Sequence, residues 1–303
     1  MGNAIDWAKK AGVDGFRLDA VKHIDLSWLK ALRGRLASEG LQGQGGRRFY
    51  LVGETLDGDR ALLKKFVEPK TMLDGQFDFP LRAQLVKAIL MRQGSFKDLH
   101  AFLLTNDSYY GAGSVMGTFI GNHDLPRAIH LAEDTPQFGE WDSGKSRAWS
   151  NQPQAPSDAK PYQRLGVAFA FLLTSPGVPL LYYGDELGLA GAGDPDNRRP
   201  MPWGTAGAEP TRLKALIEKL IAIRHQHPAL RRGSRKEVWL ADDVYAYQMS
   251  ASKDVVIVAL NRSDQQQTIK LTATSYLDLL GNETVAGDAV SMPPRSARVM
   301  VAK

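Results

Sequence analysis

Three carboxylates stand at the ends of short apolar segments: Asp19 closes GFRLD, Glu54 closes FYLVGE and Asp124 closes MGTFIGNHD. Cleavage of a glycosidic bond uses carboxylates to attack the sugar carbon, to protonate the leaving oxygen and to stabilise the charged transition state. A lone carboxylate at a strand end is most often a helix N-cap or a loop ion pair, so each residue taken alone is weak evidence. Their joint occurrence favours an active site that cleaves a bond between sugars.

The neighbours of these carboxylates refine the assignment. Residues two apart in a strand share a face, so we expect Arg17 to point the same way as Asp19. An adjacent guanidinium keeps a carboxylate ionised, as a nucleophile requires. Glu54 follows the apolar sequence LVG, which favours its protonated form and hence the role of acid. His123 and Asp124 together offer a donor and an acceptor to one sugar.

Short strands alternate with amphipathic helices along most of the chain. The expected strands are Gly15–Asp19, Phe49–Glu54, Asp74–Phe79, Met116–Asp124 and Val178–Glu186. This order predicts an α/β fold with a parallel sheet of about five βα units. Because the sequence has no Gly-rich phosphate loop, a partial (β/α)8 TIM barrel is favoured over a dinucleotide-binding fold. Such barrels carry catalysis at the carboxyl ends of their strands, where the three carboxylates stand.

From about Val238 the pattern changes to short alternating strands without helices between them. This pattern is typical of a small antiparallel β domain. The predicted domains are therefore an incomplete catalytic barrel over 1–233 and a C-terminal β domain over 234–303.

The stretch Ala132–Lys160 is long for a loop between a strand and a helix, and it contains Trp141 and Trp149. We hypothesise that one of these tryptophans stacks on a sugar ring. The alternative is that the indole packs the loop onto the barrel.

Composition excludes several classes of protein. The chain has 303 residues, 43% of them hydrophobic, and no Cys, which excludes disordered and disulfide-stapled classes. The longest apolar run, Val167–Leu173, is too short for a membrane helix, so we expect a soluble protein with no membrane partner. The net charge of +5 is scattered, which favours a solvated surface over a nucleic-acid site.

Several motifs, in this order, carry a resemblance to a known family: RLDAVKH (17–23), VGET (52–55), FIGNHD (119–124), PGVPLLYYGDELGL (176–189) and DPDNRRPMPW (194–203). They resemble motifs of the α-amylase family, glycoside hydrolase family 13. The strands ending in MPPRSARVMV are similar to that family's C-terminal sandwich. The resemblance covers essentially the whole chain.

The resemblance implies a role for each matching residue. Asp19 would be the nucleophile, Glu54 the general acid/base and Asp124 the transition-state stabiliser. The substrate-binding residues would be Arg17, which orients the nucleophile, with His123, Lys22 and His23. We add three residues ourselves: Trp141, Trp149 and Arg198, the last of which would contact either substrate or the carboxylates Asp185 and Glu186. The implied function is a retaining hydrolase of α-1,4-glucans and maltooligosaccharides. The alternatives are a transglycosylase or isomerase of the same family, such as a trehalose synthase or cyclomaltodextrinase, and a catalytically silent sugar-binding fragment.

The resemblance begins just before the family's fourth barrel strand. The first residues look like the tail of a helix running into Gly12 and hold no signal-peptide core, so we expect a truncated N-terminus and leave localisation open. Five strands cannot close a barrel, so we expect the missing half to come from a longer chain, a partner chain or self-association. Of the family's usual calcium ligands only the His23 carbonyl remains. We therefore predict no metal site here and no certain cofactor, Ca²⁺ belonging to the complete fold.

Overall fold

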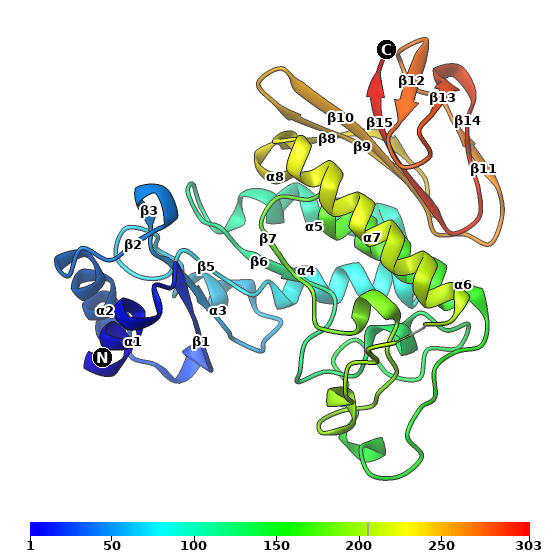
Figure 1. Cartoon of the computed structure of the whole chain (residues 1–303). Coiled ribbons are helices and arrows are strands. Elements are labelled where there is room, and N and C mark those ends of the chain that lie inside the picture. Colours follow the sequence, from blue (N-terminus) through cyan, green and yellow to red (C-terminus); the bar gives the residue numbers. More distant parts are fainter. Residues whose placement is uncertain (205) are drawn as a thin grey trace. The chain divides into compact units, whose positions relative to one another are not determined.

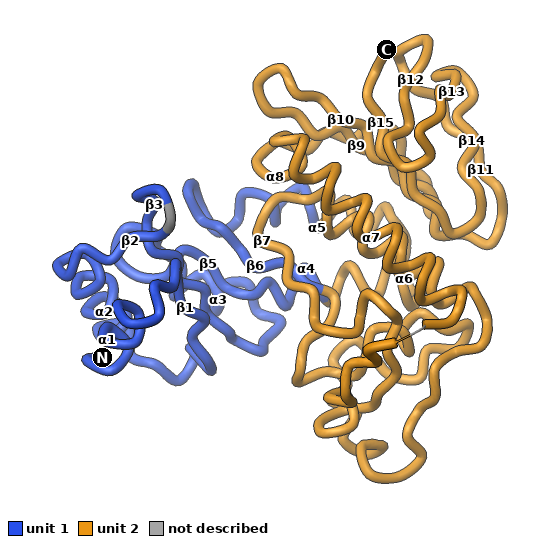
Figure 2. The backbone as a smooth tube through the Cα atoms, in the orientation of Figure 1, with its two compact units in different colours: residues 1–82, 103–119 blue, residues 83–102, 120–303 orange. Residues whose placement is uncertain are grey.

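The computed structural model describes residues 1–204 and 206–303, which form two compact units (Figure 2). Unit 1 consists of residues 1–82 and 103–119, and unit 2 of residues 83–102 and 120–303. The helices α4 (Phe79–Leu85) and α5 (Phe96–Tyr109) each contribute residues to both units.

Unit 1 is built of parallel strands and helices (Figure 1). Its elements are α1 (Gly2–Ala11), β1 (Gly15–Leu18), α2 (Leu26–Ser38), β2 (Gln42–Gly43), β3 (Arg47–Arg48), β4 (Tyr50–Gly53), α3 (Arg60–Lys64), β5 (Gly75–Gln76) and β6 (Gly117–Phe119), with 3₁₀ turns η1 (Val21–His23) and η2 (Gln44–Gly46). Strands β1, β4 and β5 pair in parallel in that order, and a parallel bridge joins Phe77 to Gly117 of β6. The alternation expected for these segments is therefore present.

Local sequence explains how β1, α2 and β4 fit together. Asp25 caps α2 by accepting a hydrogen bond from the Ser27 amide at 2.7 Å. The same helix buries leucines at helical spacing, Leu29, Leu32 and Leu36. Strand β1 passes so close to β4 that a Cβ on Gly15 would lie 2.3 Å from the Tyr50 carbonyl oxygen. Only glycine permits this approach at the first residue of β1.

Unit 2 contains the long helices α6 (Ala159–Leu173) and α7 (Ala208–Gln226), which pack side by side (Figure 1). Its other elements before the C-terminal sheet are the π-helical turn η3 (Val86–Leu90), β7 (Val178–Leu180), α8 (Ala229–Arg232) and the 3₁₀ turns η4 (Ala128–Leu131), η5 (Lys145–Arg147), η6 (Asp185–Leu187) and η7 (Asp196–Arg198). Helix α6 is buried from Pro161 to Leu173 except at one position, Gln163. No helix within the described residues is both long and apolar enough to cross a membrane.

The C-terminal part of unit 2 is an antiparallel sheet of six strands in the order β13-β12-β15-β10-β9-β8. These strands are β8 (Ser234–Leu240), β9 (Val244–Ala251), β10 (Asp254–Asn261), β12 (Ser275–Asp278), β13 (Glu283–Ala286) and β15 (Ser296–Ala302). A second ladder pairs β11 (Gln267–Ile269) with β14 (Val290–Met292), next to the 3₁₀ turn η8 (Gly287–Ala289). Residues of both, among them Ala259 and Met292, share one buried core. The antiparallel β structure expected for this part is confirmed; the domain boundary at 233/234 stays a prediction.

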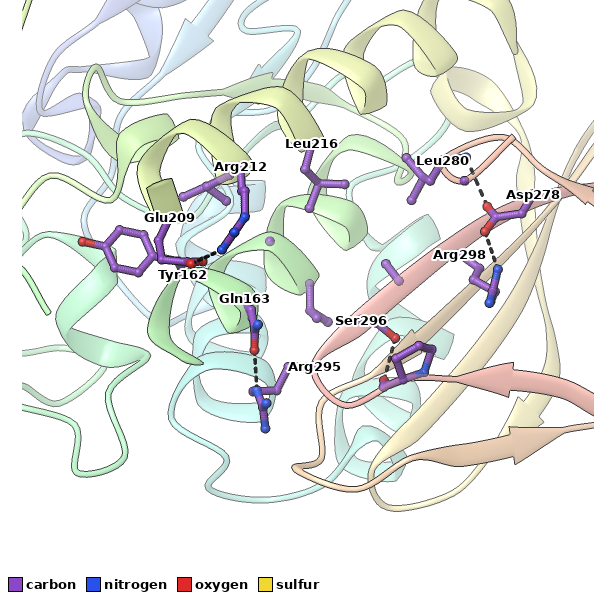
Figure 3. Close-up of a pocket in the computed structure, with 16 residues that line it drawn as sticks. Tyr162, Gln163, Glu209, Arg212, Leu216, Asp278, Leu280, Arg295, Ser296 and Arg298 are labelled. Carbon is purple, nitrogen blue, oxygen red and sulfur yellow. Dashed lines mark hydrogen bonds and ion pairs between the residues drawn. The ribbon is translucent and has the colours of Figure 1, made fainter. Parts of the chain in front are cut away.

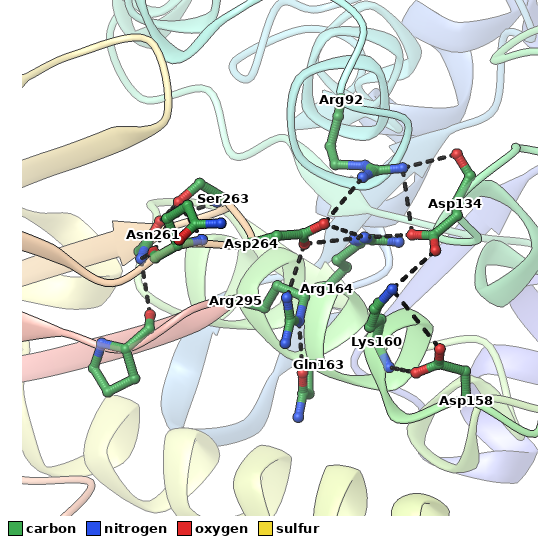
Figure 4. A network of polar contacts seen from close by, with 12 residues as sticks. Arg92, Asp134, Asp158, Lys160, Gln163, Arg164, Asn261, Ser263, Asp264 and Arg295 are labelled. Atoms are coloured by element: carbon green, nitrogen blue, oxygen red, sulfur yellow. Dashed lines mark hydrogen bonds and ion pairs between the residues drawn. The ribbon is translucent and has the colours of Figure 1, made fainter.

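A network of charges joins α6 to a loop of the C-terminal sheet (Figure 4). The buried guanidinium of Arg164 donates to Asp134 at 2.7 Å and to Asp264 at 3.2 Å. Arg295 donates to the same Asp264 oxygen at 2.8 Å. A third cation, Arg92, lies 3.9 Å from the other Asp264 oxygen. Asp264 thus pairs with three cations, and the bond from Arg164 holds the loop after β10 against α6.

Candidate active site

Asp19, the proposed nucleophile, directly follows β1 in unit 1. Its carboxylate forms an ion pair with Arg17 on the same face of the strand. The Asp19 side chain is 74% exposed, so it is accessible to a substrate. The charge partner inferred from the two-residue spacing is therefore present, beside an open carboxylate.

Glu54 follows β4, the direct neighbour of β1. In the parallel register Leu18 faces Gly53, so Asp19 and Glu54 are the next residues on adjacent strands. The Glu54 amide donates to the Leu18 carbonyl at 2.8 Å, and its carbonyl accepts from Val21 at 2.8 Å. The two carboxylate-bearing residues consequently follow neighbouring strands at the same end of the sheet.

The Glu54 side chain is held as firmly as its backbone. Its carboxyl oxygen Oε2 accepts a hydrogen bond from the Ala20 amide at 3.0 Å, and Glu54 is buried. Ala20 adopts a left-handed conformation with φ of 46°, which a non-glycine residue adopts rarely. This turn after Asp19 aims the Ala20 amide at Glu54 and so couples the two carboxylate positions.

Lys22 and His23, proposed for the leaving-group side, lie in η1 just after this turn. Lys22 Nζ donates to the Leu56 carbonyl at 3.1 Å, and the His23 side chain is exposed. Unit 1 thus brings together five of the proposed site residues: Arg17, Asp19, Lys22, His23 and Glu54.

Asp124 lies in unit 2, on the loop that follows β6. One carboxylate oxygen lies 3.3 Å from His123 Nε2 and the other 3.9 Å from Arg198 Nη2. The Asp124 amide donates to the Asn122 side chain at 3.0 Å. Arg198 itself pairs more closely with Asp194, at 2.9 Å. Unit 2 therefore assembles His123, Asp124 and Arg198 into one exposed polar group.

The two tryptophans of the long loop flank η5. Trp141 is 43% exposed and Trp149 is 83% exposed. A side chain as open as that of Trp149 does not pack the loop against the protein. Its exposure is what a sugar-stacking platform requires, and sugar binding by either indole stays a prediction.

The side chains that could donate to a metal ion do not form a cluster in the described part of the chain. Within residues 1–204 and 206–303, no three His, Asp or Glu side chains gather closely enough to hold a metal ion. The residues present therefore do not fit a side-chain calcium site, and none is assigned.

A hollow of unit 2 is lined by other residues (Figure 3). It has a volume of about 630 Å³ and is lined by α6, α7 and strand ends of the C-terminal sheet. Its charged groups pair internally, Arg212 with Glu209 and Arg298 with Asp278. None of the proposed site residues lines it, so it has no part in the proposed chemistry.

Two buried residues of unit 2 that contact the Asp124 loop were not singled out from the sequence. Arg127 is three residues after Asp124, and Asn197 lies in η7. The sequence gives one indication of a buried role for Arg127, because its charge lies among apolar residues in LPRAI. Asn197 lies in the motif DPDNRRPMPW, which marks the segment but not its contacts, because its partners lie more than 70 positions away.

The fold and the adjacent carboxylates define a class of enzymes that process glycosidic bonds. The family described as "Alpha amylase, catalytic domain" matches residues 3–233, and the chain belongs to this α-amylase family, glycoside hydrolase family 13. A "Beta-galactosidase C-terminal domain" family matches residues 250–302.

Individual relatives agree with the family. The chain is 30% identical over 309 residues to a beta/alpha-amylase of Paenibacillus polymyxa, covering 98% of this chain and 23% of the relative. It is 30% identical over 276 residues to a cyclomaltodextrin glucanotransferase of Niallia circulans, covering 89% of this chain and 33% of the relative. An α-amylase of Geobacillus thermoleovorans, solved with acarbose, superposes with a TM-score of 0.78 at 25% identity. The superposition covers 97% of this chain and 61% of the amylase. The chain thus spans about a quarter to a third of these curated relatives.

Proposed function

We propose that this chain supplies the catalytic carboxylates of a retaining α-glucan hydrolase of the α-amylase type, which cleaves α-1,4-glycosidic bonds. In this proposal the βα units belong to an incomplete (β/α)8 barrel over 1–233, and activity requires the missing N-terminal half. A longer chain, a partner chain or self-association would supply that half.

The observation that carries the proposal is the register of β1 and β4. Adjacent strands lie about 4.8 Å apart, and Asp19 and Glu54 follow facing residues on such a pair. Retaining glycosidases hold their two carboxyl groups about 5–5.5 Å apart, whereas inverting ones need about 6.5–9.5 Å to admit a water. The register sets the spacing of the two backbones and so places the carboxylate-bearing residues next to each other, which supports the closer, retaining arrangement.

Each carboxylate has one role in this reaction. Asp19, paired with Arg17, attacks the anomeric carbon and forms a covalent glycosyl-enzyme. Glu54 donates its proton to the departing oxygen and then takes a proton from the water that hydrolyses the intermediate. Asp124 stabilises the positive charge of the transition state, with His123 and Arg198 as sugar contacts and Lys22 and His23 on the leaving-group side.

A second candidate is transglycosylation, in which a sugar hydroxyl replaces water as the acceptor. The similarity to cyclomaltodextrin glucanotransferases supports it, because those relatives are named for transfer. Trehalose synthase and cyclomaltodextrinase activities belong to the same alternative.

The experiment is an assay on soluble starch and maltooligosaccharides, with the chain alone and with a supplied N-terminal half. Shorter reducing sugars with retained anomeric configuration are expected once the barrel is complete. Rearranged or cyclic sugars without net hydrolysis would replace the hydrolase with the transferase. Sugar binding without any turnover in either arm would leave only the silent-fragment function.

A further inference from the structure

We infer that Asn197 is a positioning residue for Asp124, acting together with Arg127 from within unit 2. The inference rests on the proposed function, because it concerns the place at which the Asp124 carboxylate is held. We call the contacts between Asn197 and Arg127 and the segment 123–127 the loop clasp.

The first half of the loop clasp is the amide of Asn197. This side chain is completely buried, and its Nδ2 donates to the His123 carbonyl at 2.8 Å and to the Leu125 carbonyl at 2.9 Å. These two carbonyls stand on either side of Asp124. One amide group therefore fixes the peptide unit that joins His123 to the proposed transition-state stabiliser, and the peptide unit that follows Leu125.

The second half of the loop clasp is a hydrogen bond that the segment 123–127 donates to the turn carrying Asn197. Arg127 Nε donates to the Asn197 carbonyl at 2.7 Å, so segment and turn hold each other. The guanidinium is buried, pairs with Asp185 at 3.0 Å and lies 4.1 Å from the ring centre of Tyr182. Such a cation has one stable position, because its charge is paired and its face is covered.

The turn that carries Asn197 is itself braced. Asp196 accepts from the Ala192 amide at 2.7 Å and from Arg199 Nε at 2.8 Å. The Asn197 amide is thus delivered by a fixed piece of backbone, which a positioning role requires.

The Asp124 side chain has weaker restraints of its own. Its nearest charged groups are at 3.3 and 3.9 Å, and the carboxylate-bearing side chain is 37% exposed. Its location consequently depends on the backbone that carries it. Since misplacement of a reacting group by about 1 Å can cost on the order of 100-fold in rate, the loop clasp affects turnover more than substrate affinity.

The chain offers a matched control in Asn261. This asparagine is also completely buried, and its Nδ2 donates to the carbonyls of Gln265 at 2.8 Å and Pro293 at 2.8 Å. It performs the same kind of backbone bracing in the C-terminal sheet, without contact to segment 123–127. Asn261→Ala therefore reports what the loss of a buried bracing amide does by itself.

The experiment compares Asn197→Ala with Asn261→Ala in the full chain. Hydrogen exchange of a peptide spanning 119–127 is measured, together with kcat and KM on a maltooligosaccharide, with the N-terminal half supplied where activity needs it. We expect both variants to lower the melting temperature. Only Asn197→Ala should accelerate exchange in 119–127 and lower kcat at least 10-fold, with KM changed less than 3-fold.

Equal losses of kcat in the two variants, or unchanged exchange in 119–127, would overturn the inference. If Asn197→Ala does not fold, Arg127→Lys serves in its place, because it keeps a cation for Asp185 and removes the Nε bond to Asn197. A wild-type chain that cleaves no α-glucan, with exchange accelerated only by Asn197→Ala, would refute the proposed function and leave the loop clasp standing. If the wild type is active and the two variants behave alike, the loop clasp is refuted and the proposed function stands.

Discussion

Arg164 on α6 and Asp264 in the loop after β10 are joined by a hydrogen bond of 3.2 Å between Nη2 and Oδ1. The Arg164 side chain is completely buried, so its charge depends on its acidic partners, Asp264 and Asp134. Burying a guanidinium is costly unless its charge is paired. The contact therefore ties the stability of α6 to that of the C-terminal sheet.

Asp264→Ala should lower the stability of the chain. The substitution removes one partner of Arg164 and one of Arg295, while Asp134 still compensates Arg164. Because hydrogen bonds to charged groups contribute roughly 1.5–3 kcal/mol, we expect a loss of about 2 kcal/mol. Urea unfolding measures it, with Asp288→Ala, an exposed carboxylate, as control. Identical midpoints for the two variants would contradict the prediction.

Asp134 should make the chain sensitive to acid. Hydrogen bonds from Arg164 and then Lys160 lower the pKa of Asp134 from 3.8 to about 2. A carboxyl whose folded pKa is depressed stabilises the fold above its unfolded pKa, and that contribution is lost as pH falls from about 4 to 2. Asp134 is largely exposed, so solvent screening keeps the contribution small.

The measurement is the melting temperature of wild type and Asp134→Asn at pH 5 and pH 3. The wild-type advantage at pH 5 should shrink at pH 3. An advantage that is the same at both values would show that Asp134 does not titrate with the fold.

The sequence predicted the positions of the strands better than their lengths. A strand was expected over Val178–Glu186, but β7 ends at Leu180. Gly184 turns the chain with φ of 85°, and Asp185 is then engaged by Arg127. This contact joins residues 58 positions apart, so the local sequence pattern does not predict it.

In the candidate site, too, local contacts could be predicted from the sequence and distant ones could not. Arg17 and Asp19 could be paired from the sequence, because residues two apart in a strand share a face. The pairing of β1 with β4 followed only from the class of fold, and the role of Asn197 could not be foreseen at all. The contacts between a side-chain amide and distant carbonyls produce no periodic pattern in the sequence from which they could be predicted.

Trp149→Ala should weaken the binding of maltooligosaccharides. Loss of a stacked aromatic costs roughly 0.5–1.5 kcal/mol beyond the buried area, so we expect affinity to fall about 3- to 10-fold. Titration calorimetry measures it, with Trp141→Ala alongside. Unchanged affinity in both variants would remove the tryptophans from the site.

Glu54→Gln should abolish turnover and leave the fold intact. The amide oxygen of glutamine can still accept the hydrogen bond from Ala20, whereas the proton needed by the leaving oxygen is lost. Loss of general acid catalysis costs on the order of 100-fold or more in kcat. The assay uses the complete enzyme, and a melting temperature equal to wild type excludes unfolding. Activity above a few per cent would contradict the acid role.

Asp19→Asn should abolish turnover of the complete enzyme while sugar binding persists. Asparagine keeps the size of the side chain and cannot form the glycosyl-enzyme ester, so the first chemical step is blocked and the affinity is not. The exposed Asp6 on α1 offers a control, Asp6→Asn, which should leave kcat unchanged. Mass spectrometry of enzyme quenched during turnover of an activated glycoside should show a glycosyl adduct in the control and none in Asp19→Asn. An adduct in Asp19→Asn would place the nucleophile on another residue.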